Sequence, residues 1–345
     1  MKLLIITQKV DDHDDVLGFF VRWIEEFAKC AEKVTVVCLQ KGTYYLPDNV
    51  TVLSLGKEDP ANICGIKTFR YIERFYRYVW NERNNYDAVF VHMNPIYIVL
   101  GGVFWKFWHK KIALWYTHKQ VDLKLRIAEI FSDIIFTASK ESFRLKSGKV
   151  QIVGHGIDTE RFHTVDKWPH EKLRIISVSR IAPVKNIHIM IEAAVLLKKA
   201  GVSFEMKIVG APITDADRTY FVHLKKKAQE KKVDDCVFFV GAVPYSDIPA
   251  FYQKSDLFIN LSETGSLDKA VLEAMASGVN VLTSNEAFFD MLPPQNILRD
   301  LSASALVERI QFFTNNKANS TILREIIAKN HDMSVLIKNI YIKIG

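Results

Sequence analysis

The sequence has little cysteine, and its few thiols are scattered. Four of its 345 residues are cysteines, Cys30, Cys38, Cys64 and Cys236. Paired zinc ligands stand only a few residues apart, and small disulfide scaffolds carry far more cysteine for their length. We therefore expect reduced thiols that serve as small core residues, and no metal site is implied.

Long apolar runs are also absent. The segment Met1–Thr7 is apolar but too short for the core of a secretory signal, and it runs into the acidic residues Asp11 and Asp12. The longest apolar run, Ile96–Trp105, is too short to cross a bilayer. We expect a cytoplasmic protein, or one bound peripherally to the cytosolic face of a membrane.

A glycine-rich turn is missing after the first predicted strand, Lys2–Thr7. The residues Gln8–Asp12 stand where many nucleotide-binding domains place glycines, so this half is not expected to hold nucleotide phosphates. The same loop carries the acidic pair Asp12 and Asp14, a pattern able to hold a divalent cation. Acidic residues before a helix are more often caps, and we predict no metal there.

What the sequence does contain is a regular alternation of strand-like and helix-like segments. Hydrophobic residues make up 49 % and charged residues 25 %, the balance of a globular protein. The first half opens as strand, helix, strand at 2–7, 15–31 and 33–39, and further strands are predicted at 87–92, 111–117, 133–137 and 150–153. The second half alternates through strands at 173–179, 204–209, 236–240, 256–260 and 279–283 and helices at 187–200, 215–231, 246–254 and 267–277.

This alternation predicts an α/β fold of two doubly wound, Rossmann-like domains that face each other across a cleft. We place the first domain at 1–160 and the second at 170–330, with a linker around 154–169. Residues 331–345 are expected to form a final helix.

Positive charge is concentrated in the first half. Residues 61–150 hold 15 lysines and arginines against 7 acidic residues, in a chain of net charge +7. A predicted helix at 67–82 carries Arg70, Arg74 and Arg77 at helical spacing, and an aromatic helix follows at 95–108. Two interpretations stay open: a face for an anionic membrane surface, or core aromatics with solvated arginines.

The stretch Ser262–Gly278 is a loop that becomes a helix directly after a predicted strand. Gly265 and Ser266 allow a tight turn, Asp268 suits the electropositive first turn, and Gly278 ends the helix. Backbone N–H groups at such a helix start are able to hold an anion, and Glu273 is able to accept hydrogen bonds from a ribose diol. Taken alone, this stretch is more simply an ordinary surface helix.

Several segments together favour the functional interpretation, because they resemble family 4 glycosyltransferases of the GT-B fold. The strand and helix at 256–260 and 272–282 resemble that family's donor-site block, and Ser177–Asn186 resembles its diphosphate clamp. Gly154–Asp158 is similar to its interdomain signature, and Val240–Val243 to its base-binding loop. The motifs are specific in combination, and each one alone is weak.

The resemblance implies that the domain at 1–160 binds the acceptor, that the domain at 170–330 binds the nucleotide sugar, and that the helix at 331–345 crosses back to the first domain. It therefore implies a donor site in the second half of the chain. The diphosphate clamp is Arg180 and Lys185, Glu273 binds the ribose, and His118 lines the transferred sugar; these four are the candidate catalytic residues. The other candidate donor-binding residues follow predicted strands or open a helix: Gly210, Gly241, Ala242, Val243, Gly265, Ser266, Leu267 and Asp268.

One departure from the family pattern affects this site. The family places a glutamate eight positions before the one matched by Glu273, and this chain has Gly265 there. We expect the backbone N–H groups of Gly265, Ser266 and Leu267 to hold the donor. Whether Glu263 or Asp268 substitutes for the absent carboxylate stays open.

The resemblance implies a hexosyltransferase-like enzyme that moves a sugar from a nucleotide-diphosphate sugar to a glycan or polyprenyl-linked acceptor. It implies retention at the anomeric carbon and neither a catalytic metal nor a further cofactor. Two alternatives are a nucleotide-sugar epimerase of the same fold, which acts without an acceptor, and a basic nucleic-acid-binding protein. The chain lacks a zinc-finger or aromatic RNA-binding signature, so we predict no nucleic-acid partner.

Overall fold

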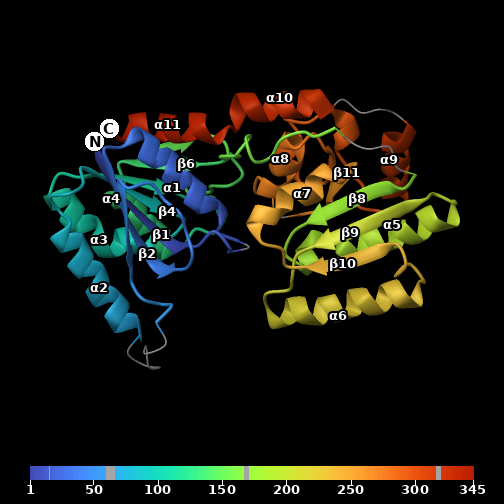
Figure 1. Cartoon of the computed structure of the whole chain (residues 1–345), viewed down its shortest axis with the longest axis horizontal. Coiled ribbons are helices and arrows are strands. Elements are labelled where there is room, and N and C mark those ends of the chain that lie inside the picture. Colours follow the sequence, from blue (N-terminus) through green and yellow to red (C-terminus); the bar gives the residue numbers. More distant parts are fainter. Residues whose placement is uncertain (15, 60–66, 167–170, 264, 316–319) are drawn as a thin grey trace. The chain divides into compact units, whose positions relative to one another are not determined.

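A computed structural model describes residues 1–14, 16–59, 67–166, 171–263, 265–315 and 320–345 (Figure 1). Three predictions touch the remaining positions: the thiol of Cys64, the start of the first helix at Asp15, and the end of the linker at 167–169. These lie outside the described residues.

The first sheet has seven strands in the order β3-β2-β1-β4-β5-β6-β7. Its strands are β1 Lys2–Val10, β2 Lys33–Lys41, β3 Val50–Ser54, β4 Ala88–His92, β5 Lys111–Trp115, β6 Ile134–Thr137 and β7 Val150–Ile152. The helices packed with it are α1 Phe19–Cys30, α2 Lys67–Asn81, α3 Ile96–Phe107, α4 Leu123–Phe131 and α11 Met333–Ile344. Helices α2, α3 and α4 share one core cluster on one face of the sheet, and α11 packs against α1 (Figure 1).

The second sheet has five strands in the order β10-β9-β8-β11-β12. Its strands are β8 Leu173–Val178, β9 Phe204–Val209, β10 Val237–Gly241, β11 Leu257–Asn260 and β12 Asn280–Thr283. Its helices are α5 Ile187–Lys199, α6 Asp215–Glu230, α7 Ile248–Gln253, α8 Lys269–Ala276, α9 Ala303–Asn315 and α10 Ser320–Asn330. Helices α5, α6 and α9 build one core cluster with the strands, and α8 packs against α10.

Both sheets are parallel and doubly wound, which confirms the predicted α/β fold class. In each sheet the strand order reverses once, between β1 and β4 and between β8 and β11. Ligands of open α/β sheets bind at such a switch point, beyond the carboxyl ends of the strands. In the second sheet this rule selects the loops that follow Val178 and Asn260.

The differences from the predicted elements are local. Strand β3 and helix α4 are not predicted from the sequence, and neither is largely buried: β3 is mostly half-buried with no fully buried residue, and α4 buries only Leu125 and Ala128. The helix predicted at 15–31 begins only at Phe19, and the one predicted at 246–254 is a short 3₁₀ turn followed by α7. Gly278 adopts a φ of +69° just past α8 and ends that helix as predicted.

The chain divides into two compact units, Met1–Gly156 with Asp332–Gly345, and Ile157–His331. The first boundary falls a few residues before the predicted 160, because the segment after Gly156 already packs into the second unit. Phe162 is buried there, with its ring 5.7 Å from that of Tyr245. The last helix, α11, belongs to the first unit.

Within the described part of the chain, no helix is long and apolar enough to cross a membrane. The three cysteines described, Cys30, Cys38 and Cys236, are free thiols, and Cys38 is fully buried. Burial raises the pKa of the Cys38 thiol to about 12, so this cysteine is a core residue rather than a nucleophile.

His331 predicts an acid-sensitive stability. Its side chain is 4 % exposed, and burial lowers its pKa from 6.5 to about 4. The unfolded chain therefore binds a proton between these values that the folded chain does not, so stability is lost as pH falls from about 6.5 to 4. Between pH 7 and pH 5, we expect the free energy of unfolding of His331→Gln to fall by about 2 kcal/mol less than that of the parent, at about 1.4 kcal/mol per pKa unit.

Urea unfolding at the two pH values measures this difference. His163→Gln, at an exposed histidine of the same unit, is the matched control and should change stability with pH as the parent does. Equal acid sensitivity of the His331 variant and the parent would contradict the assignment.

Candidate functional site

The turns that follow β8 and β11 are bonded to each other. The Glu263 amide donates to the Val184 carbonyl at 3.3 Å. The Asn186 side chain donates to the Leu261 carbonyl and to the Glu263 carboxylate, both at 3.1 Å. Asn186 adopts a φ of +50°, a conformation that asparagine tolerates better than most residues. The two loops at the switch point therefore form one unit.

Lys185 lies at the centre of this unit. Its ammonium group contacts the Asp268 carboxylate at 3.0 Å and the Ser262 hydroxyl at 3.1 Å. The Lys185 and Asp268 side chains are only 13 % and 17 % exposed, so solvent screens this ion pair less than a surface pair. Asn260 donates a further hydrogen bond to the same Asp268 oxygen at 2.9 Å.

This arrangement gives Asp268 partners that the sequence does not predict. The residue stands at the N-cap of α8, but its side chain makes no capping hydrogen bond. Its carboxylate instead turns toward Lys185 and Asn260. Leaving a nearly buried cation without a nearby anion costs more free energy than leaving the helix start without a side-chain cap.

Arg180 follows β8 directly and keeps 45 % of its side chain exposed. Its Nε lies 3.9 Å from the carboxylate of Asp217, which is nearly buried in the first turn of α6. Hydrogen bonds from the Thr214 backbone and side chain, helped by the charge of Arg180, lower the pKa of Asp217. Asp217 thus gives Arg180 a fixed anionic neighbour while the guanidinium stays accessible to a ligand.

The two glycines at strand ends have different surroundings. A Cβ at Gly210 would come 1.9 Å from the Ser179 carbonyl oxygen, so protein backbone alone requires glycine there. Gly210 also donates to the Gly241 carbonyl at 2.7 Å. A Cβ at Gly241 would meet nothing within 4 Å. Open space therefore exists beside Gly241, and donor binding by Gly210, Gly241, Ala242 and Val243 stays a prediction.

The segment that follows β12 stabilises the loop before α8. Gly265 is buried with a φ of +60°, which strains any other residue. The buried Asn285 side chain donates to the Ser266 carbonyl at 2.7 Å, and Leu267 is buried. These contacts fix the backbone of the predicted donor loop, and its bonds to a donor stay a prediction.

Glu273 is neither an exposed surface residue nor a lone carboxylate. It is 4 % exposed and accepts a hydrogen bond from the Tyr245 hydroxyl at 2.9 Å. Its carboxylate lies 3.2 Å from the ammonium group of Lys269, which also donates to Tyr245 at 2.8 Å. Burial lowers the pKa of Lys269 and, with the nearby Glu273 charge, raises that of Tyr245. The three side chains form a closed network at the start of α8.

Two predicted features belong to the first unit. His118 follows β5 with an exposed side chain, 5.7 Å from the ring of Tyr116, and its place beside a transferred sugar stays a prediction. The Asp14 carboxylate accepts hydrogen bonds from Lys9 and from the amides of Val16 and Leu17. Burial by itself would raise the pKa of Asp14, but these hydrogen bonds have the larger combined effect and lower it. Across the described residues, no group of three or more histidine, cysteine or acidic side chains is arranged to hold a metal.

Sequence reasoning did not single out several side chains that shape this site. They are Asn186, Tyr245, Asn260, Lys269 and Asn285. Asn260 is the last residue of the buried strand β11 and Asn186 directly precedes α5, so polar side chains at these element ends are a pattern able to reveal them. Tyr245 carries no comparable signal, because its partner Glu273 is 28 residues away.

The second unit also matches a known protein family. The family described as glycosyl transferases group 1 matches residues 158–330, half of the chain. The chain belongs to this family. The match contains every candidate site residue named above except His118.

Several curated relatives of this group 1 chain are named as glycosyltransferases. The amylovoran biosynthesis glycosyltransferase AmsK of Erwinia amylovora is 30 % identical over 156 residues, which cover 43 % of this chain and 37 % of the relative. The alpha-monoglucosyldiacylglycerol synthase of Streptococcus pneumoniae is 28 % identical over 155 residues, 45 % of this chain and 31 % of the relative. The matches therefore span less than half of these relatives.

Solved structures show the same fold over almost the whole chain. HepE of Anabaena, in complex with UDP and glucose, superposes with a TM-score of 0.76 at 15 % identity, over 99 % of both chains. Sucrose-phosphate synthase of Thermosynechococcus elongatus gives 0.77 at 14 % identity, over 99 % of this chain and 98 % of that one. The fold of this group 1 chain is thus the GT-B fold.

The network around Glu273 predicts a stability effect in this group 1 chain. Glu273→Ala would remove the carboxylate that lies 3.2 Å from the shielded ammonium of Lys269, and breaking a buried pair from one side costs about 3 kcal/mol. We expect the double variant Lys269→Met/Glu273→Ala to recover at least half of this loss, because no charge is left unpaired. Urea unfolding measures both.

Glu230→Ala is the matched control. Glu230 pairs with Lys226 four residues earlier in the same unit, both side chains are more than half exposed, and its loss should cost less than about 1 kcal/mol. If Glu273→Ala costs no more than this control, Glu273 has no structural role.

Proposed function

We propose that this chain transfers a hexose-like sugar from a nucleotide-diphosphate sugar to a glycan or polyprenyl-linked acceptor. The observation that carries the proposal is Lys185, a nearly buried cation fixed where the loops after β8 and β11 meet. Arg180 adds an accessible guanidinium from the same turn. A fork-shaped and a point-like cation together suit the oxygens of a diphosphate.

Stabilisation of the leaving group is the main catalytic contribution in this proposal. As the bond from the anomeric carbon to the donor oxygen breaks, negative charge develops on the nucleotide diphosphate. Charged groups that are already oriented stabilise this charge without reorganising during the reaction. Lys185 meets that condition, because Asp268 and Ser262 hold its ammonium group in place.

We further propose retention of the anomeric configuration and a reaction without a catalytic metal. Retention rests on the resemblance of the donor-site motifs to family 4 enzymes. Metal independence rests on the two cations, which neutralise the charge that a metal ion would otherwise meet. The carboxylate of Asp14 is engaged by Lys9 and by backbone amides, so it is a poor candidate ligand.

The acceptor proposal draws on the relatives. One is named for biosynthesis of amylovoran and another as an alpha-monoglucosyldiacylglycerol synthase. A glycan or lipid-linked acceptor fits both names. It also fits a cytoplasmic protein located peripherally at the cytosolic membrane face. Neither the epimerase nor the nucleic-acid-binding alternative is favoured by any contact in the site.

The donor site is tested with Lys185→Met. A thermal-shift panel of UDP, GDP and their sugars first identifies the donor, since a ligand of the folded state raises its stability. We then expect the variant to lose about a hundredfold or more in kcat/KM for transfer, about 2.7 kcal/mol of transition-state stabilisation.

Lys198→Met is the matched control, because Lys198 is a half-exposed lysine of the same unit paired with Asp235. Near-parent activity is expected there, and EDTA should leave the parent enzyme unchanged. A folded Lys185 variant with normal turnover would contradict the assignment of Lys185 to the diphosphate clamp. Loss of activity in EDTA, restored by magnesium, would refute metal independence.

Between Glu263 and Asp268, the contacts favour Asp268 as the substitute for the absent family glutamate. Asp268 shares its carboxylate with Lys185 inside the site, whereas Glu263 is exposed and bonded to Asn186. We expect Asp268→Asn to lose tenfold or more in kcat/KM, about 1.4 kcal/mol, with nucleoside diphosphate affinity not weakened.

Glu263→Gln is the control, and its kcat/KM should stay within about twofold of the parent value. A weakened diphosphate affinity in Asp268→Asn would show that Asp268 only positions Lys185. A larger loss in Glu263→Gln than in Asp268→Asn would assign the role to Glu263.

A further inference from the structure

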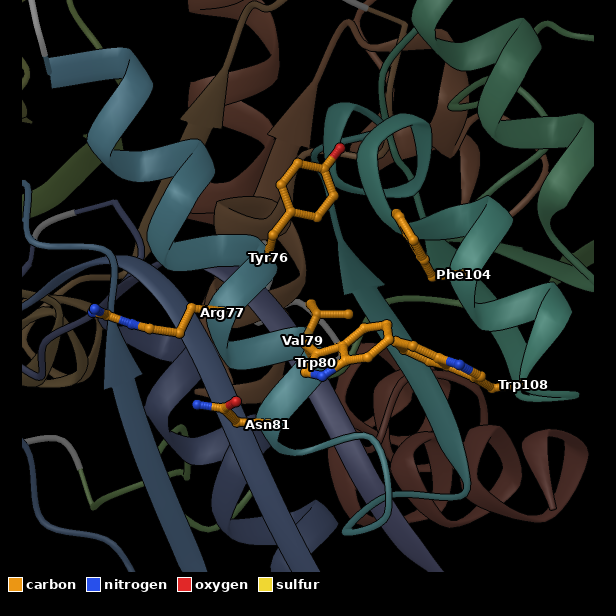
Figure 2. Close-up of a pocket in the computed structure, with 7 residues that line it drawn as sticks. All are labelled: Tyr76, Arg77, Val79, Trp80, Asn81, Phe104 and Trp108. Carbon is orange, nitrogen blue, oxygen red and sulfur yellow. The ribbon is translucent and has the colours of Figure 1, made fainter.

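Helices α2 and α3 lie side by side and form an aromatic groove. Figure 2 shows Tyr76 and Trp80 on α2 next to Phe104 and Trp108 of the α3 segment. The rings meet in two pairs, Tyr76 with Phe104 at 5.8 Å and Trp80 with Trp108 at 5.6 Å between centroids. The groove has a volume of about 430 Å³ and is lined by Tyr76, Arg77, Val79, Trp80, Asn81, Phe104 and Trp108.

The core of the first unit accounts for only part of these aromatic side chains, because Tyr76 and Trp108 pack against it whereas Trp80 and Phe104 are exposed. Phe75 on α2 and Trp105 on α3 are fully buried. On their outer sides, the same helices expose large apolar residues: Phe69 71 %, Trp80 53 %, Val103 58 %, Phe104 37 % and Phe107 78 %. An apolar face of this kind commonly marks an interaction site.

Positive charge accompanies this face. Residues 67–111 hold eight lysines and arginines against three acidic residues. The Arg77 side chain is 52 % exposed at the groove and lies 3.9 Å from the exposed Glu73 carboxylate, a pair that solvent screens strongly. The Arg83 guanidinium stacks over Trp80 at 4.8 Å. Arg74 does not belong to the face, because it donates to the Leu55 carbonyl and pairs with Asp59. The predicted row of three arginines is therefore not one uniform surface.

The positive charge of this face distinguishes between two possible occupants, a second copy of this chain and an anionic bilayer. A second copy would bring the same positive face against this one, and like charges repel. An anionic bilayer offers opposite charge to the cations and an apolar layer to the aromatic rings, which favour the interfacial region of membranes. Net positive charge on an apolar, aromatic face therefore fits lipid rather than self-association.

We propose that the face formed by α2 and α3 docks this chain on an anionic phospholipid bilayer, with the aromatic groove in the interfacial layer. This inference deepens the proposed membrane location and identifies the surface that makes the contact. It rests on the proposed function only in the choice of a membrane-borne acceptor, because lipid binding is measured without any glycosyl transfer.

The experiment is co-sedimentation of the full chain with phosphatidylglycerol or phosphatidylcholine vesicles. We expect binding to the phosphatidylglycerol vesicles in 0.1 M salt, and loss of binding in 1 M salt, where the Debye length falls to about 3 Å. The variant Phe69→Ser/Phe107→Ser removes two highly exposed rings and should weaken partitioning tenfold or more. Trp80→Ser, inside the groove, should weaken it as well.

Ile213→Ser/Val222→Ser is the matched control, because both residues are more than half exposed in the second unit. It should bind vesicles as the parent does. Absence of parent binding, or equal binding by the Phe69/Phe107 variant, overturns the proposal. Self-association of the parent that this variant abolishes, with vesicle binding unchanged, would assign the face to a second copy. Thermal shifts with UDP and GDP on the same variants report separately on the donor site.

Discussion

The ion pair between Lys185 and Asp268 ties together the two loops on which the site depends. Strand order alone brings the ends of β8 and β11 side by side, but it does not orient the side chains that follow them. The ammonium group is nearly buried, so it requires a close anion, and Asp268 supplies one at 3.0 Å. Asn260 then fixes the carboxylate, and Asn186 fixes the partner loop. An arriving diphosphate would thus meet a cation that is already positioned, and would have to share it with Asp268.

Much of the fold was predictable because buried strands and amphipathic helices leave a strong periodic signal. In the second unit, every strand and helix predicted up to β12 exists within a few residues of its expected bounds. The elements that were missed, β3 and α4, pack only part of their surface against the core. Without full burial, selection for apolar residues is weaker, so neither periodicity stands out from the surrounding sequence.

The side-chain directions of the site were less predictable. From the sequence, Asp268 is expected only to suit the electropositive start of α8, and the position of Lys185 is needed to show where its carboxylate points. From the sequence, Gly210 is a candidate donor-binding residue, but the Ser179 carbonyl oxygen occupies the space beside it. In both cases the deciding neighbour comes from another strand end, so no local pattern contains the information.

Glu273 shows how such a neighbour changes the chemistry expected of a residue. The sequence does place Lys269 one helical turn earlier on the same side of α8, which allows an ion pair. Tyr245 arrives from the segment after β10 and completes the network. A ribose hydroxyl at Glu273 would therefore approach a carboxylate whose charge is largely balanced, and each new hydrogen bond would compete with an existing one. The gain from such a contact is then mainly orientation, since the Lys269 and Tyr245 bonds already fix where the carboxylate lies.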